Sequence, residues 1–122
     1  MPRPILDEQR VHPAIRDQVA NLHADVVHNV QAASMSHPVL VVGMAGNPFC
    51  RRARKLLDAA GQDHRYLEYG SYLSLWRTRN ALKMWTGWPT FPMVFVKGSL
   101  IGGADDLGRL IASGELKRLL GE

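Results

Sequence analysis

The segment from Val39 to Cys50 constrains the fold more than any other part of this 122-residue chain. The four consecutive apolar residues at its start, Val39–Val42, predict a short buried strand, and a glycine-containing link follows them. Asn47 and Pro48 then open a helix, because Asn is a preferred N-cap and Pro is tolerated at the first helical position. The free N–H groups and positive dipole end of such a helix stabilise a thiolate or a bound carboxylate. Cys50 therefore lies where thiol chemistry is favoured, but it is the only cysteine and has no partner.

The composition sets the class of protein. With 46% hydrophobic residues in 122, the chain is long enough for one domain with a core of its own. The single cysteine excludes an intrachain disulfide and a multi-cysteine zinc site, and it fits a reducing compartment. The sequence has neither an apolar run of about 20 residues nor the apolar region of a signal peptide. We therefore expect a cytoplasmic protein that makes no use of a membrane.

Charge and histidine spacing argue against two further function classes. The net charge is +4, and the densest basic cluster lies directly after Cys50, at Arg51, Arg52, Arg54 and Lys55. No nucleic-acid recognition motif and no interleaved aromatic residues accompany the cluster, so a solvated helix face is the favoured interpretation and a nucleic-acid partner is not expected. The five histidines lack an i,i+4 pair on one helix, so no metal site is predicted.

The helical segments follow from apolar spacing. Residues 1–36 read as an N-terminal extension with one amphipathic helix, whose apolar stripe is Ile15, Val19, Leu22, Val26, Val27 and Val30. Residues 37–122 form the single globular unit. A second helix is expected from Pro48 to about Ala60, with Cys50 on its inward stripe, and further helices over 72–85, 106–112 and 115–120.

Short apolar runs between these helices predict the remaining strands. They cover residues 64–68, 93–96 and 100–101, and the last two are joined by a tight Lys97-Gly98 turn into a hairpin. A crossover unit followed by a hairpin gives a small mixed sheet with helices on both faces, in the α/β class.

Three strings of residues, in this order, resemble the glutaredoxins of the thioredoxin superfamily and are closest to their monothiol class. They are Leu82–Pro92, which contains Trp-Pro-Thr-Phe-Pro, then Ile101-Gly-Gly-Ala-Asp105, and the tail Ser113–Leu120. The resemblance covers nearly the whole chain. It implies a thioredoxin-like fold with a four-stranded mixed sheet flanked by helices, a cis bond before Pro92, and glutathione as the ligand of a thiol–disulfide oxidoreductase.

The same resemblance implies a degenerate active site. Monothiol members carry Cys-Gly-Phe-Ser at the helix start, whereas this chain has Asn-Pro-Phe-Cys, which puts Asn47 at the position of the nucleophile and Cys50 at the second, usually buried, position. A lysine that faces glutathione in the family is replaced by Met44. Because an iron–sulfur cluster would need the missing cysteine as its ligand, no cluster is expected.

Other glutathione positions match the family residue by residue. Arg79 corresponds to the clamp for the glycine carboxylate, Thr90, Phe91 and Pro92 to the backbone that pairs with the cysteinyl unit, and Gly103, Ala104 and Asp105 to the loop that holds the γ-glutamyl end. Each has a plainer interpretation: Arg79 as a solvated helix residue, Asp105 as a helix cap and Pro92 as a strand-edge proline. Their joint occurrence in family order favours a retained groove.

The reactivity of Cys50 decides between two functions. The neighbouring arginines would lower the pKa of its thiol, whereas burial on the apolar stripe would raise it, and an Asn47 cap would use the same N–H donors as a thiolate. A quiet, buried thiol is the favoured interpretation. The chain is then either a glutaredoxin-like oxidoreductase, impaired or dependent on Cys50, or a non-catalytic binding module for a glutathione-like ligand or a thiol-bearing partner protein.

Overall fold

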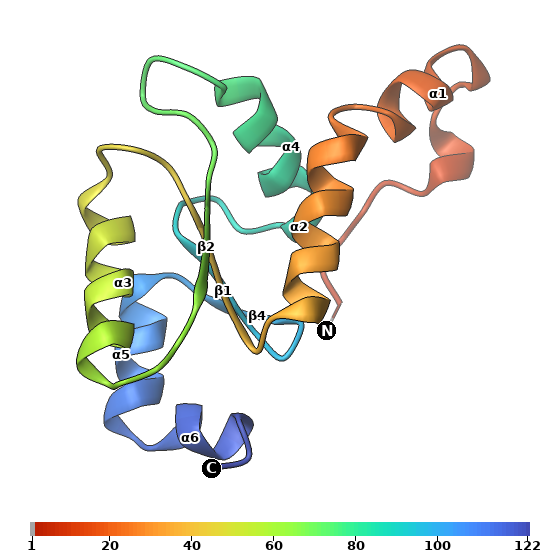
Figure 1. The fold of residues 1–122 in the computed structure, drawn as a ribbon. Coiled ribbons are helices and arrows are strands. Elements are labelled where there is room, and N and C mark those ends of the chain that lie inside the picture. The colour runs from red at the N-terminus through yellow and green to blue at the C-terminus, as the bar shows by residue number, and fades with distance from the viewer. Residues whose placement is uncertain (1) are drawn as a thin grey trace.

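A four-stranded mixed sheet lies at the centre of the computed structural model, which describes residues 2–122 (Figure 1). The strands are β1 (Val39–Gly43), β2 (Arg65–Glu68), β3 (Met93–Val96) and β4 (Ser99–Gly102), in the spatial order β2-β1-β3-β4. The β1 and β2 strands run parallel, while β3 is antiparallel to both β1 and β4. The predicted four-stranded mixed sheet and its final hairpin are confirmed.

Helices cover both faces of this sheet. In chain order the helical elements are the 3-10 turn η1 (Glu8–Arg10), α1 (Pro13–Ala20), α2 (Ala24–Ser36), α3 (Pro48–Ala59), α4 (Trp76–Thr86), α5 (Ala104–Ala112) and α6 (Glu115–Leu119). Figure 1 shows α2 and α4 on one side of the strands and α3 with α5 on the other. Alternate residues of β1 supply the two cores, because successive side chains of a strand point to opposite faces. Leu40 packs in the core under α2 and α4, and Val41 packs in the core under α3 and α5.

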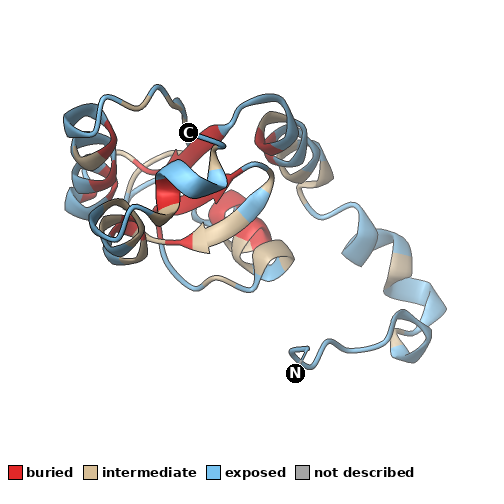
Figure 2. Ribbon diagram, turned by 90° about the horizontal axis from the view of Figure 1, so that it is seen from below, coloured by how far each residue is buried: buried red, intermediate tan, exposed pale blue. Residues whose placement is uncertain are grey.

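The N-terminal region departs from the predicted single helix. The expected stripe is divided between α1 and α2, because His23 has a left-handed backbone with φ of 47° and interrupts the helical course. Only α2 reaches the sheet, where Val30 is completely buried, whereas Ile15 and Val19 on α1 remain exposed. Figure 2 shows this exposed arm extending from the body of the molecule. The predicted apolar stripe packs against the core along α2, but the prediction is wrong for α1, where the same stripe stays exposed.

The α4 helix begins later than predicted, at Trp76 instead of Tyr72. Ser71 and Ser74 close a turn through their side chains, and Leu75 then takes a left-handed conformation with φ of 56°. A helix cannot continue through either feature, because both direct backbone groups away from the helical pattern. The other helices and strands agree with the prediction to within about two residues, the usual uncertainty of element ends. No helix in the described part of the chain combines the length and apolar character needed to cross a membrane.

Candidate active site and groove

Asn47 caps α3 and occupies the position where the resemblance places a nucleophile. Its Oδ1 accepts hydrogen bonds from the backbone N–H of Phe49 at 2.8 Å and of Cys50 at 3.1 Å. The backbone of Asn47 is extended, with φ of −92° and ψ of 119°, as an N-cap requires. The donors at this helix terminus, which would stabilise a thiolate, are therefore occupied by a neutral amide.

The Cys50 thiol is buried behind this cap. The residue is 1% exposed and belongs to the core cluster with Leu40, Met44 and Leu82. Gly43 allows this packing, since a Cβ at that position would lie 2.8 Å from the sulfur and 3.0 Å from the Tyr66 ring. The Cys50 sulfur and the Tyr66 ring thus pack closely against the backbone of β1 at Gly43, and this packing shields the thiol from a reagent in solution.

The surroundings of Cys50 favour the neutral thiol. Burial raises its pKa, and the negative charge of Glu68 acts in the same direction, while a backbone hydrogen bond at Met44 and the charge of Arg51 oppose them. Tyr66 does not offer a base, because burial and the 2.9 Å hydrogen bond of its hydroxyl to Glu68 raise its pKa as well. Since the thiolate is the nucleophile, the raised pKa of Cys50 works against exchange chemistry.

Met44 stands at the position of the family's glutathione-facing lysine, and its side chain points inward. It is 6% exposed and packs with Val30, Phe91 and Phe95 in the core. A lysine at this position would have to leave the core or bury its charge at considerable cost. Methionine at this position therefore fits the packing of the core, whereas a lysine would not.

A groove lies beside the N-terminus of α3, and most of the predicted glutathione-binding residues line it. The cavity has a volume of about 220 Å³. Its predicted members are Thr90, Phe91, Pro92, Gly103, Ala104 and Asp105. The bond between Phe91 and Pro92 is cis, as the sequence predicts.

Three residues of the groove were missed in the sequence: Phe49, Trp88 and Asp106. Two of them stand inside strings that had already been singled out, since Phe49 belongs to Asn-Pro-Phe-Cys and Trp88 opens Trp-Pro-Thr-Phe-Pro. Phe49 is 55% exposed. An aromatic residue that lies outside the apolar stripe of a helix, beside the helix start, is the sequence signal that points to it.

The groove offers hydrogen-bond donors beside the carboxylates of Asp105 and Asp106. The first N–H groups of α5 have no acceptor within the helix, because helical bonding begins one turn later. The indole Nε1 of Trp88 is shielded and has no hydrogen-bond partner, the single such buried side-chain atom among residues 2–122. A Cβ added to Gly103 would lie 3.8 Å from this nitrogen. A ligand rich in carbonyl and carboxylate oxygens suits such a set of donors.

One end of the groove is closed by an ion pair. Nη1 of Arg52 on α3 lies 2.5 Å from Oδ1 of Asp105 on α5. Both side chains remain more than half exposed, so the pair is open to exchange with solvent or with a ligand. Asp105, which the resemblance assigns to the γ-glutamyl end of glutathione, therefore already holds a cation.

Arg79 lies outside the residues that line the groove. It is 7% exposed, and its Nη1 donates to the carbonyl oxygens of Tyr69 at 3.0 Å and Ser74 at 2.6 Å. These bonds hold the segment between β2 and α4, which also accepts a hydrogen bond at Gly70 from the Ala45 N–H. The observed contacts of Arg79 are structural, and a contact with a ligand carboxylate stays a prediction.

Asp106 closes the first turn of α5. One carboxylate oxygen accepts the Gly103 N–H at 2.9 Å and the other pairs with Arg109 at 2.7 Å. The Gly103 hydrogen bond and then Arg109 hold the pKa of this carboxyl below its ordinary value. Because the carboxyl has a lower pKa in the folded state than in the unfolded chain, it stabilises the fold at pH values above the unfolded-state pKa. This stability is lost as the pH falls through the folded-state pKa.

We expect Asp106→Asn to lower the free energy of unfolding by about 1 kcal/mol at neutral pH, as loss of a helix cap does. The difference from the wild type should shrink as the pH falls below about 4, where the native carboxylate itself becomes protonated. Urea unfolding of both proteins across this range measures the effect. Asp105→Asn is the matched control, because the Asp105 carboxylate pairs with Arg52 and not with the Gly103 N–H. An equal loss in both variants would contradict the capping role.

No group of three or more His, Cys, Asp and Glu side chains within the described range is placed to hold a metal ion.

Comparisons with known proteins agree with this fold. The family model described as Glutaredoxin matches residues 39–101. A "Glutaredoxin-like protein" of Dictyostelium discoideum is 45% identical over 102 residues, covering 84% of this chain and 83% of that protein. The rice "Monothiol glutaredoxin-S11" is 37% identical over 71% of this chain, which spans only 18% of that longer protein. The structure of a buckwheat glutaredoxin–glutathione complex superposes with a TM-score of 0.71 at 27% identity, covering 83% of this chain and 92% of that one.

Proposed function

Because this chain belongs to the glutaredoxin family of thiol oxidoreductases, we propose that it binds glutathione in its groove and exchanges disulfides only weakly. The chain is then a ligand-binding member of a redox family. The lone cysteine of the chain remains compatible with a reducing cytoplasm.

The observation that carries the proposal is the placement of Asn47 and Cys50. Disulfide exchange begins with attack by a thiolate, so an accessible sulfur is indispensable. The helix terminus carries an amide, and the only thiol of the chain, that of Cys50, belongs to a residue that is 1% exposed and has a raised pKa. Attack by Cys50 would require the α3 N-terminus to open first, and its rate would be reduced by the population of that opened state.

The groove supports glutathione as the ligand. Its γ-glutamyl carboxylate would accept from the free N–H groups at the start of α5, and its cysteinyl unit would pair with the backbone at Thr90. Trp88 Nε1 has no acceptor, and it would have to turn out of its buried position to donate to the ligand. The ligand ammonium group would compete with Arg52 for Asp105, which lowers the expected affinity.

The rival function is a redox enzyme that uses Cys50 with glutathione as reductant. Its support is the position of Cys50 in the first turn of α3, where helix N–H groups and Arg51 favour a thiolate. Burial outweighs these effects, so binding without fast exchange is the better-supported function. A thiol-bearing protein segment is the corresponding macromolecular ligand for the same groove.

We expect glutathione to bind with a Kd of about 1 mM or weaker. With Met44 in place of the family's lysine, one charge-assisted hydrogen bond to the ligand is lost, and such a loss costs about 1.5–3 kcal/mol of binding free energy. Amide chemical shifts of Thr90, Ala104 and Asp105 should move on titration. S-methylglutathione should produce the same shifts, because binding does not need the free thiol. Asp105→Asn should weaken binding, and Arg52→Ala should strengthen it by up to about fivefold, the range of an exposed ion pair.

Arg118→Ala serves as the control for these variants, because Arg118 pairs with Glu115 on α6 and neither residue lines the groove. Glutathione shifts confined to other parts of the molecule would contradict the proposed groove. Binding of glutathione disulfide but not of S-methylglutathione, with a covalent adduct at Cys50, would instead support the redox enzyme.

A further inference from the structure

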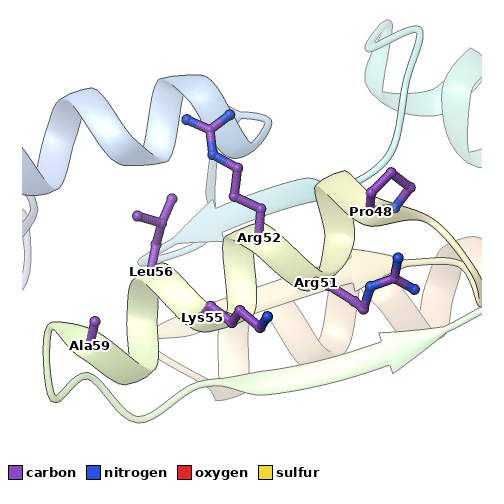
Figure 3. A pocket seen from close by; sticks show the side chains of 6 residues that line it. All are labelled: Pro48, Arg51, Arg52, Lys55, Leu56 and Ala59. Atoms are coloured by element: carbon purple, nitrogen blue, oxygen red, sulfur yellow. The ribbon is translucent and has the colours of Figure 1, made fainter.

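A shallow basic hollow runs along the exposed side of α3. Six residues of this helix line it, with a cavity volume of about 460 Å³: Pro48, Arg51, Arg52, Lys55, Leu56 and Ala59. Figure 3 shows these side chains from the start of the helix to its last turn. Their spacing of three or four residues places them on one continuous stripe, because such residues are neighbours on a helix surface. The groove for glutathione does not explain this stripe.

The positive charge of the whole protein is concentrated on this helix. Four of the fifteen Lys and Arg residues lie in α3 with only one of the eleven Asp and Glu residues, so α3 carries +3 of the net charge of +4. Arg52 is paired with Asp105, and Arg54 lies over the Tyr66 ring. Arg51 and Lys55 are exposed and take part in no ion pair formed by residues 2–122. Two free cations thus flank the hollow.

The lining of the hollow is apolar between its cations. Pro48, Leu56 and Ala59 contribute an aliphatic surface, and Leu56 also packs against the core under α3 and α5. Carboxylates of a ligand would pair with Arg51 and Lys55, and aliphatic side chains of the same ligand would cover the apolar lining. The two properties together match an acidic segment that also carries leucine-like residues.

The hollow adjoins the groove. Arg52 lines the hollow and Asp105 lines the groove, and their ion pair forms the ridge between the two. Pro48 and Phe49, adjacent in sequence, belong to the hollow and the groove respectively. A segment seated on α3 would therefore hold its protein beside the groove.

We propose that this basic hollow docks an acidic, leucine-bearing segment of a partner protein. A single-stranded nucleic acid is the other polyanion to consider, but its binding sites combine cations with aromatic stacking surfaces. The lining of the hollow contains no aromatic residue. The aliphatic lining thus favours a peptide, and this proposal does not rest on glutathione binding in the groove.

The test uses a fluorescein-labelled peptide of glutamate with leucine at every third or fourth position, titrated with the full-length protein at low salt. We expect saturable binding, with amide shifts along α3 and a Kd that rises with salt. Lys55→Glu should weaken binding at least about tenfold, because it replaces attraction by repulsion at the centre of the hollow. Lys97→Glu makes the same charge change in the β3–β4 turn and should alter the Kd less than about twofold.

Two further probes complete the test. A peptide with every leucine replaced by glutamine keeps the charge and should bind at least about tenfold more weakly, since it cannot cover the apolar lining. An oligothymidylate of the same charge should bind more weakly than the leucine peptide. The proposal is overturned if Lys97→Glu weakens binding as much as Lys55→Glu, if the glutamine peptide binds equally well, or if the oligothymidylate binds more tightly.

Discussion

Asn47→Cys is expected to raise glutathione-dependent reduction of a small mixed disulfide by about two to three orders of magnitude over the wild type. The new sulfur would face the Phe49 and Cys50 N–H groups that Asn47 Oδ1 now occupies. Hydrogen bonds to the charged form and the helix dipole lower the pKa of a thiol, so a larger fraction becomes thiolate. In the wild type the N-terminus of α3 must first open to expose Cys50. An opening free energy of about 3–4 kcal/mol corresponds to the expected difference of two to three orders of magnitude in rate.

The decisive version of this variant also carries Cys50→Ser, which assigns any activity to position 47. Asn47→Ser is the matched control, because serine keeps a helix cap but supplies no thiol. Turnover should be measured with glutathione, glutathione reductase and a mixed disulfide substrate. Wild-type turnover equal to that of the Asn47→Cys variant would refute the argument from position, and an active Asn47→Ser control would assign the gain to loosening of the helix start.

The fold could be predicted from the sequence because its signals are local and mutually consistent. Val39–Val42 form a strand buried on both faces, and the Lys97-Gly98 turn joins two short apolar runs into the observed hairpin. The break at His23 could not be foreseen from apolar spacing, since Ile15 and Val19 continue the pattern. Whether an apolar stripe is covered depends on which other element reaches it, and that is a tertiary property.

The site was predictable where its residues are contiguous. Thr90–Pro92 and Gly103–Asp105 arrive in the groove as short strings, so finding the strings located the groove. Contacts between residues far apart in the sequence could not be predicted. The pair of Arg52 with Asp105 joins residues 53 positions apart, and Arg79 turned to backbone carbonyls instead of the groove. Such contacts depend on competition among partners that are brought together only by folding.

The Cys50 thiol should react with a thiol reagent at least about a thousandfold more slowly in the native protein than in the urea-unfolded chain. A buried group reacts only in states that expose it, and an opening free energy of about 4 kcal/mol gives this factor. Because burial raises the pKa of Cys50, the native rate should also continue to rise with pH beyond the range in which the unfolded thiol has levelled off. Stopped-flow absorbance with an aromatic disulfide, from pH 7 to about 10, covers the range in which an ordinary thiol levels off.

The variant Asn47→Cys combined with Cys50→Ser provides the comparison within the same fold. Its thiol at the helix cap should react faster than Cys50 and reach its plateau at a lower pH, because helix N–H groups stabilise that thiolate. A wild-type native rate within about tenfold of the unfolded rate would mean that Cys50 is exposed on the reaction timescale. In that case the impaired exchange proposed for this glutaredoxin would have to be abandoned, and the groove would be the binding site of a cysteine-dependent enzyme.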